Sequence, residues 1–248
     1  DQFEKKLINY LDEKNVVFAN EDLKRLKMLY NYLEDGNMVS LVGPKGEIKS
    51  LSSQVVCEFS GRRLIHFVLN SSTSFRDFMK RSCPFITAFE NGHTLLLEID
   101  NANSRCHQFI RKILNDGFIK IPGVDEKIYK HKDFRLITTQ DSDFGTDLTN
   151  LAKIINFSAY TKNDLIEMGQ KLAKKINCNC SRKLIEDLVE FDIKWSELEN
   201  SLIRNNELFS FRRITATIRA ISEDENLYEA VMMIYGSRHS EENRMKLQ

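Results

Sequence analysis

The most informative segment of this sequence is Met38-Val39-Ser40-Leu41-Val42-Gly43-Pro44-Lys45-Gly46-Glu47-Ile48-Lys49-Ser50. Its apolar start predicts a buried strand, followed by a tight loop and the beginning of a helix. The spacing nearly matches the pattern G-x-x-x-x-G-K-[ST], in which backbone N–H groups wrap a phosphate, a lysine reaches its oxygens and a hydroxyl holds magnesium. Gly43, Lys49 and Ser50 stand where this pattern requires them, whereas Ile48 replaces the second glycine.

The isoleucine leaves two interpretations of this loop open. A β-branched residue resists positive φ and adds a Cβ where the backbone must approach the anion. The segment is therefore either a phosphate-binding loop deformed by Ile48 or an ordinary strand–turn–helix with a chance lysine. In the first interpretation the nucleotide-binding residues are consecutive: Gly43, Pro44, Lys45, Gly46, Glu47, Ile48, Lys49, Ser50 and Leu51.

Composition restricts the class of protein. A chain of 248 residues that is 42% hydrophobic and 29% charged can bury a large core in one domain or two. Its 36 basic and 36 acidic residues cancel, which argues against a global field that draws it onto nucleic acid or an anionic membrane. No apolar run reaches the length of a membrane span. The start without Met suggests a segment of a longer protein.

The cysteines favour an intracellular, reducing compartment. They are odd in number and scattered, as expected of free thiols. Cys178 and Cys180 have no second pair at metal-ligand spacing, so we expect no zinc site there.

Hydrophobic patterns predict a parallel sheet in the first part of the chain. Helical spacing predicts helices at 3–13 and 20–34, and apolar runs predict strands separated mostly by helices, which is typical of a sheet covered on both faces. His66, inside the second run, is expected to be packed in the core. The expected strands are 38–42, 64–69, 94–100, 134–140 and 151–157, with helices at 51–59, 74–89 and 105–114 and a hairpin at 118–130.

After Thr161 only helical patterns follow. The expected helices are 163–176, 182–191, 196–204, 211–221 and 227–235. The sequence therefore predicts an α/β domain over residues 1–160, with leading helices, and a helical domain over residues 161–248.

Two acids end the strand predicted at 94–100. The carboxyl ends of parallel strands face the ligand crevice, where an acid can support a magnesium ion bound to phosphate. Glu98 and Asp100 are two residues apart, so we expect them to point to the same face. A strand that simply ends in solvated polar residues is the alternative.

The order of these elements resembles an AAA+ module. The sequence motifs look most like those of the midasin family, which are dynein-related AAA+ proteins of ribosome assembly. The similarity covers nearly the whole chain. Its phrases are Leu41-Val42-Gly43-Pro44, Leu97-Glu98-Ile99-Asp100-Asn101-Ala102, Leu114-Asn115-Asp116, Phe118-Ile119-x-Ile121-Pro122, His131-Lys132-Asp133-Phe134-Arg135-Leu136-Ile137-Thr138-Thr139-Gln140, Phe209-Ser210-Phe211-Arg212-Arg213 and Leu227-Tyr228-Glu229-Ala230-Val231. The resemblance implies an α/β P-loop NTPase fold, a parallel-sheet αβα sandwich followed by a helical lid. It also implies ATP or ADP with Mg²⁺ as the ligand.

The resemblance assigns some binding positions in this chain. Lys49 matches the phosphate lysine, and Ser50 and Glu98 match the magnesium ligands. Arg212 matches the sensor arginine of the lid.

The same resemblance exposes several losses. Ile99 falls where the family has its catalytic glutamate, and it cannot polarise an attacking water. Asp141 falls at the sensor asparagine, where its charge would repel a γ-phosphate. The arginine finger expected within 148–157 is missing, and Lys153 is the only cation there. Such losses should reduce hydrolysis by several orders of magnitude.

The leading hypothesis is a structural or regulatory module of a six-module, midasin-like ring, with weak or no ATP hydrolysis. The resemblance implies neighbouring AAA+ modules and the pre-60S ribosomal particle as partners, and a nuclear location. The alternatives are an active ATPase with Asp100 or Glu98 as the catalytic base, a dynein-type motor module, and an interaction platform without nucleotide. We expect no membrane and no direct nucleic-acid contact.

Overall fold

The computed structural model describes residues 2–44, 48–121, 127–141, 148–203, 211–223 and 226–236. Its contacts divide the chain into two compact units. Residues 21–158 form the α/β unit, and residues 1–20 together with 159–248 form the helical unit. None of the described helices is long and apolar enough to cross a membrane.

The first helix, α1 (Gln2–Glu13), groups with the helical unit instead of leading the α/β domain as the sequence analysis expected. The Lys175 ammonium pairs with Asp12 Oδ1 at 2.6 Å and donates to the Val16 carbonyl at 2.9 Å. Val17 joins the apolar cluster of the helical unit. These long-range contacts were not visible in the local pattern.

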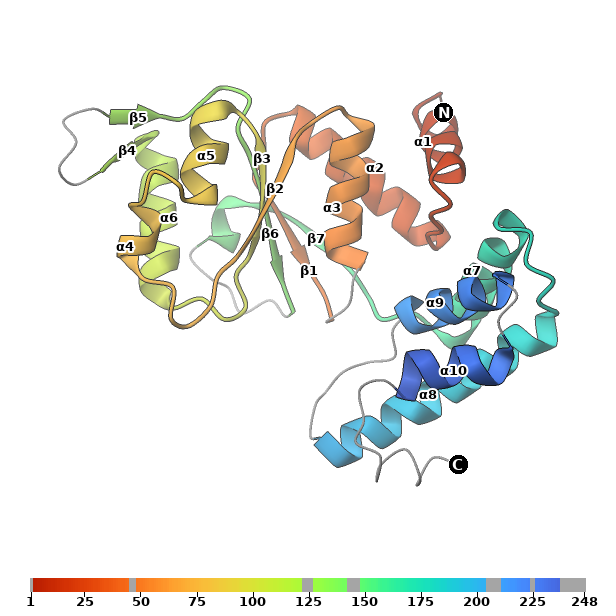
Figure 1. Ribbon diagram of the computed structural model, residues 1–248. Helices are drawn as coiled ribbons and strands as arrows, with labels where there is room; N and C mark the ends of the chain where they lie inside the picture. The colour runs from red at the N-terminus through yellow and green to blue at the C-terminus, as the bar shows by residue number, and fades with distance from the viewer. Residues whose placement is uncertain are drawn as a thin grey trace. The chain divides into compact units, whose positions relative to one another are not determined.

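A five-stranded parallel sheet forms the centre of the α/β unit, in the order β2-β3-β6-β1-β7 (Figure 1). Because every strand runs in the same direction, the carboxyl ends of β1, β3 and β6 lie along one edge of the sheet. The loops that leave these strands therefore meet at that edge. The strands are β1 (Val39–Val42), β2 (Leu64–Val68), β3 (Thr94–Glu98), β6 (Arg135–Gln140) and β7 (Lys153–Asn156).

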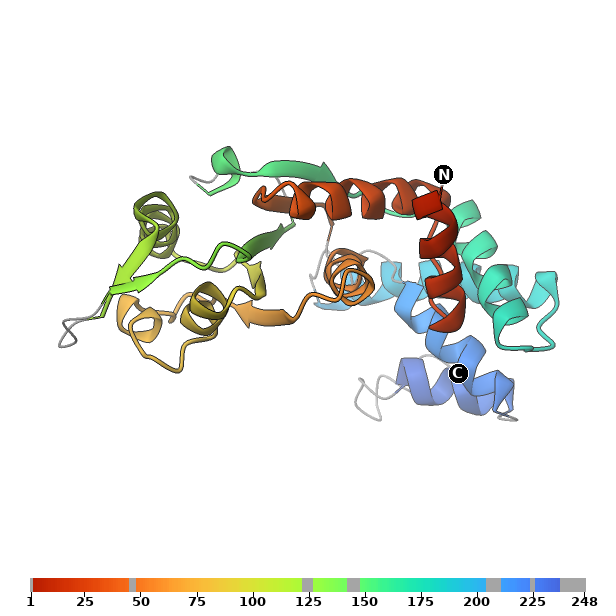
Figure 2. The same ribbon diagram turned by 90° about the horizontal axis from the view of Figure 1, so that it is seen from above.

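Helices cover both faces of this sheet. Figures 1 and 2 place α5 (Pro84–Asn91) and α6 (Ser104–Asp116) on one side and α3 (Ile48–Phe59) on the other. Helix α2 (Asn20–Glu34) lies on the same side as α3. The αβα sandwich that the resemblance implies is confirmed.

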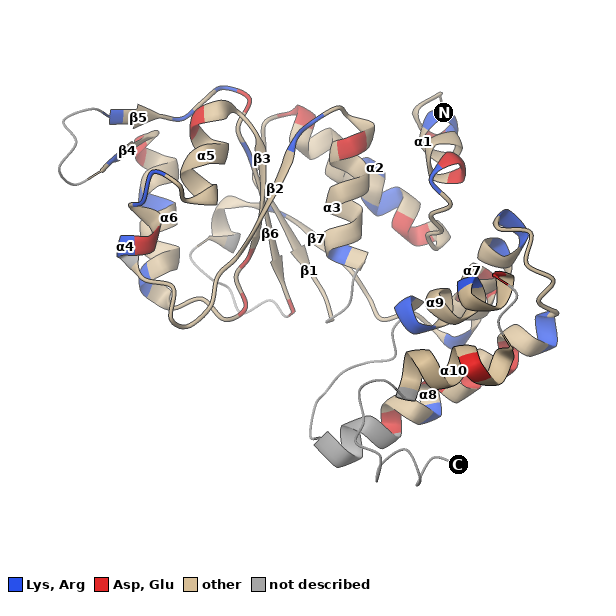
Figure 3. Ribbon diagram, viewed as in Figure 1, with Lys and Arg blue, Asp and Glu red and all other residues tan. Residues whose placement is uncertain are grey.

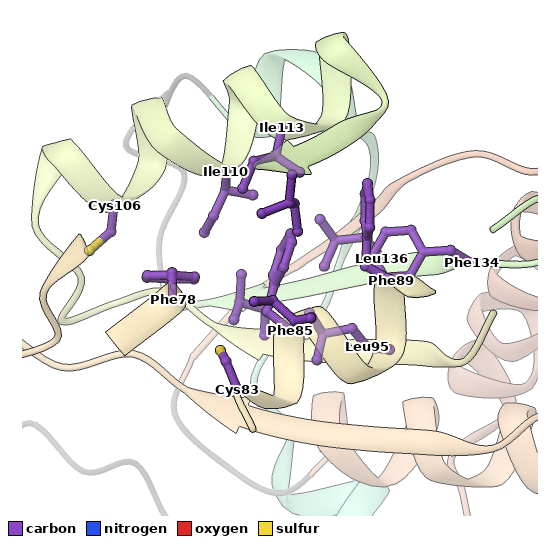
Figure 4. Packing of buried hydrophobic residues seen from close by; sticks show 14 of the residues in the cluster. Phe78, Cys83, Phe85, Phe89, Leu95, Cys106, Ile110, Ile113, Phe134 and Leu136 are labelled. Carbon is purple, nitrogen blue, oxygen red and sulfur yellow. The ribbon is translucent and has the colours of Figure 1, made fainter. Parts of the chain in front are cut away.

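Aromatic side chains fill the core beneath α5 and α6 (Figure 4). Phe85 and Phe89 of α5 stack with ring centroids 5.9 Å apart, and Phe89 meets Phe134 edge-on at 5.3 Å. Leu95 and Leu97 of β3 belong to the same cluster. Alternation along β3 consequently places Glu98 on the opposite face, the one that α3 covers.

The helix expected at 74–89 is two helices, α4 (Phe75–Phe78) and α5, so that prediction was wrong. Pro84 is the first residue of α5, and the preceding Cys83 has an extended backbone. Proline lacks the N–H that a continuing helix needs and disfavours helical geometry in the residue before it. Pro84 therefore marks in the sequence the point at which the helix is interrupted.

The hairpin expected at 118–130 has its described strands at β4 (Phe118–Lys120) and β5 (Lys127–Tyr129). A short 3₁₀ helix, η1 (Thr149–Leu151), precedes β7. The strands follow the predicted order along the chain, whereas η1 was not predicted, and Leu151, expected to begin the last strand, belongs to η1.

The helical unit contains α7 (Lys162–Lys175), α8 (Arg182–Ile203), α9 (Phe211–Ser222) and α10 (Leu227–Gly236) in addition to α1. The two helices predicted at 182–191 and 196–204 are a single helix, α8. No proline or glycine interrupts this stretch, so the predicted break had no physical cause.

A buried ion pair joins α8 to α9 in the helical unit. The Arg213 guanidinium donates to Asp192 Oδ1 at 2.7 Å and to the Ser196 hydroxyl, and it lies over the Tyr235 ring at 5.5 Å. Asp192 is fully buried. Trp195, the chain's one tryptophan, contacts Tyr235 with ring centroids 5.6 Å apart. The interior of the unit therefore depends on a paired charge.

We expect Arg213→Met to destabilise the helical unit by about 3–5 kcal/mol, because it leaves the Asp192 charge buried without its cation. The matched control is Arg212→Met, since the neighbouring Arg212 is exposed. Urea unfolding followed by Trp195 fluorescence reports directly on this unit. Equal losses in the two variants would contradict a structural role specific to Arg213.

Candidate functional site

The loop after β1 begins at a position that only glycine can occupy. A Cβ on Gly43 would lie 2.4 Å from the Phe157 carbonyl oxygen, which follows β7. The Phe157 N–H in turn donates to the Val42 carbonyl at 2.6 Å. Predicted binding residues Lys45, Gly46 and Glu47 lie outside the described residues.

Ile48 is the first residue of α3 and is half-buried. Among the described residues other than glycine, only Asn15 and Asn177 have positive φ. Ile48 therefore keeps a negative φ, as an ordinary helix residue does. The backbone strain that the sequence analysis raised for this position is absent.

The Lys49 ammonium is held by three oxygens of the protein. Nζ donates to the carbonyls of Gly43 at 2.5 Å and Pro44 at 2.9 Å, and to Asp141 Oδ1 at 3.1 Å. The residue is only 4% exposed. An ammonium has three N–H donors, so these contacts can engage all of them.

Two acids meet at the ends of β3 and β6. The Asp141 N–H donates to Asp100 Oδ1 at 2.6 Å. Burial raises the pKa of the Asp100 carboxyl, and the hydrogen bond from the Asp141 N–H only partly opposes this rise. Lys49, Asp141 and Asp100 thus form a connected chain of contacts that joins the start of the loop after β1 to the ends of β6 and β3.

The Glu98 side chain contacts a different strand from the one that Asp100 contacts. Its Oε1 lies 2.8 Å from His66 Nε2 on β2, whereas Asp100 contacts the residue after β6. Since β3 lies between β2 and β6, the two acids contact opposite neighbours. The expectation that both side chains point to the same face of the sheet stays a prediction.

His66 is a partner that the sequence analysis missed. It was expected in the core, but its side chain is 47% exposed because β2 is an edge strand. The expectation that β2 is covered on both faces was also wrong, as Val68 is 48% exposed. Only the strand order, which no local pattern contains, reveals either fact.

The remaining predicted site residues are described by their burial and by the elements in which they lie. Ile99 is 2% exposed and packs in the apolar cluster with Leu95 and Leu97. Ser50 and Leu51 are half-buried in the first turn of α3. Exposed Lys153 begins β7.

Arg212, the predicted sensor arginine, is an exposed residue of α9 in the helical unit. Its neighbour Arg213 is the one engaged with Asp192. The structure therefore gives the two adjacent arginines distinct surroundings.

The residues present fit a phosphate group only in part. A helix N-terminus and a lysine both attract anions, and α3 and Lys49 supply them. However, the Asp141 carboxylate already lies against this lysine, and Asp100 adds a second acid. Figure 3 shows acidic positions, in red, where strands of the sheet end. A phosphate would have to displace Asp141 from Lys49 in order to bind as the loop pattern implies.

The described residues fit a magnesium ion less well than they fit a phosphate group. Glu98 is engaged with His66, and the described residues contain no group of three or more His, Cys, Asp or Glu side chains that could hold a metal ion. At the position of the catalytic glutamate, Ile99 offers no group that could activate water. The described contacts of Lys49 instead hold Gly43 and Pro44 at the start of the loop.

No protein-family model matches this chain, and no curated protein matches its sequence. Solved structures do match. The RuvB Holliday junction branch migration motor of Thermotoga maritima is similar with a TM-score of 0.54 and 14% identity, over 93% of this chain and 81% of RuvB. A proline-to-glycine mutant of the same RuvB matches with a TM-score of 0.54 and 13% identity, over 93% of this chain and 82% of the mutant. RuvB is an AAA+ ATPase, and the chain described above shares its α/β P-loop fold with a helical C-terminal region.

Proposed function

We propose that this chain is an AAA+ ATPase-family module whose nucleotide site is occupied by its own carboxylate. It binds ATP or ADP with Mg²⁺ weakly and hydrolyses ATP slowly or not at all. The observation that carries the proposal is the set of contacts at Lys49, in which Asp141 takes the place next to the ammonium that a phosphate would need. The AAA+ fold supports the family assignment.

The low hydrolysis follows from what surrounds the site. Phosphoryl transfer depends on a positioned water and on cations that stabilise the transition state. Ile99 is apolar and buried, and the Asp100 carboxylate accepts the Asp141 N–H. Removal of the water-orienting acid and of the arginine finger together costs several orders of magnitude in rate.

The parent assembly is proposed to be a midasin-like ring. The sequence motifs that resemble this family include residues of β4, β6, α9 and α10. The resemblance therefore extends through both units. Neighbouring AAA+ modules are then the direct partners, the pre-60S particle is the client, and the location is nuclear. A dynein-type motor module remains the rival, because it shares the AAA+ architecture.

The hydrolysis proposal predicts that the purified chain releases phosphate from ATP no faster than the background. Lys49→Ala and Asp100→Asn should leave this rate unchanged, because neither residue serves a working reaction. A coupled phosphate-release assay measures all three proteins. Robust turnover lost in Lys49→Ala would refute the proposal, and turnover lost in Asp100→Asn would favour Asp100 as the base.

The occupancy proposal predicts that Asp141→Asn strengthens ATP binding about tenfold, or about 1.4 kcal/mol, because the substitution removes a charge beside the phosphate. Calorimetry with and without Mg²⁺ gives the dissociation constants. Asp116→Asn is the matched control, since this exposed acid ends α6, and it should change nothing. Adding Lys49→Ala to Asp141→Asn should abolish the gain. Weaker or unchanged binding in Asp141→Asn would show that its carboxylate does not compete with phosphate.

The assembly proposal predicts that the tagged parent protein sediments with precursors of the large ribosomal subunit when cells of its source are fractionated. The association should survive treatment that depolymerises microtubules. Sedimentation with microtubules instead would replace the midasin-like assignment with the dynein-type one.

A further inference from the structure

Two thiols are in contact at the turn between α7 and α8. Cys178 Sγ lies 2.8 Å from Cys180 Sγ, and both residues are half-buried. The other cysteines, Cys57, Cys83 and Cys106, are buried. Only this pair therefore combines mutual contact with access to solvent.

Helix ends fix the backbone on both sides of the pair. The Cys178 N–H donates to the Ala173 carbonyl at 2.8 Å and closes α7, with Asn177 in the left-handed region at φ 53°. The Ser181 hydroxyl accepts the Leu184 N–H at 3.1 Å at the start of α8. The facing thiols are thus held between two capped helix ends.

The geometry favours a bond between the sulfurs over a metal between them. Two sulfurs on one tetrahedral zinc are about 3.8 Å apart, given zinc–sulfur bonds of about 2.3 Å. A disulfide needs about 2.05 Å. The observed 2.8 Å is nearer to the disulfide, and the described residues provide no group of three metal-ligating side chains.

We propose that Cys178 and Cys180 form a redox-active dithiol that closes to a disulfide by exchange with small-molecule disulfides of the glutathione type. The Cys178 thiolate attacks one sulfur of the disulfide and releases the first glutathione thiolate. The Cys180 thiolate then attacks Cys178 Sγ and releases the second. The protein gives up two electrons and two protons, and one glutathione disulfide becomes two thiols.

The order of attack follows from the surroundings of Cys180. Burial raises the pKa of this thiol to about 12, and the hydrogen bond and charge of Cys178 contribute to the rise. Cys180 is therefore a poor first nucleophile at neutral pH. When Cys178 carries glutathione, its charge is removed and its thiol no longer hydrogen-bonds Cys180. The pKa of Cys180 then falls, and the second step becomes easier.

The test incubates the reduced full chain with glutathione disulfide at pH 7, blocks the remaining thiols by alkylation and maps the peptides by mass spectrometry. We expect the Cys178–Cys180 peptide to lose two hydrogens and to escape alkylation. Cys57, Cys83 and Cys106 serve as internal controls and should be alkylated only after denaturation. Added reduced glutathione should reverse the change.

Two single variants test the mechanism. Cys180→Ser should trap a stable glutathione adduct on Cys178. Cys178→Ser should form its adduct on Cys180 at least about tenfold more slowly at pH 7, because burial, the largest cause of the raised pKa of Cys180, remains in this variant. This difference should shrink as the pH rises toward the pKa of Cys180. A peptide that is doubly alkylated at every glutathione ratio would overturn the proposal, as would a disulfide to another cysteine. Equal rates in the two variants would overturn the proposed order of attack.

Discussion

The buried Lys49 ammonium is the constraint on which the carboxyl edge of the sheet depends. A charge that is 4% exposed must be paired and hydrogen-bonded, since an unpaired buried cation costs several kcal/mol. Two loop carbonyls and Asp141 meet that requirement, and Asp141 is itself tied through its N–H to Asp100. One lysine therefore fixes Gly43 and Pro44 to the residue that follows β6 and, through that residue, to Asp100 after β3.

These contacts lie within the chain, so they hold the start of the loop after β1 in place by themselves. In a working phosphate loop the lysine and the helix N-terminus attract the anion. Here Asp141 supplies the anion from within the chain, at no cost in translational entropy. The proposed loss of hydrolysis is therefore compatible with the AAA+ fold, because the contact that stabilises the start of the loop is intramolecular.

Local signals in the sequence were enough to predict the fold. The strands β1, β3 and β6 each come from a run of adjacent apolar residues, and each was found where it was expected. The environment of His66 and the divergence of Glu98 from Asp100 depend on strand order, which joins segments far apart in the chain. For the same reason the sequence identified Asp141 as a repulsive charge but could not show that it pairs with Lys49.

The comparison of Ile48 with Asp141 shows which departure from the loop pattern matters more. Ile48 was suspected of deforming the cradle, yet it begins α3 with a negative φ, so the helix accommodates it without strain. Asp141 breaks no rule of backbone geometry but puts a carboxylate 3.1 Å from the one ammonium that the loop pattern provides. In a partly buried site a charge acts more strongly than it would in water, whereas a side chain that fits a helix adds little. We infer that charge at position 141, rather than shape at position 48, sets the affinity of this module for phosphate.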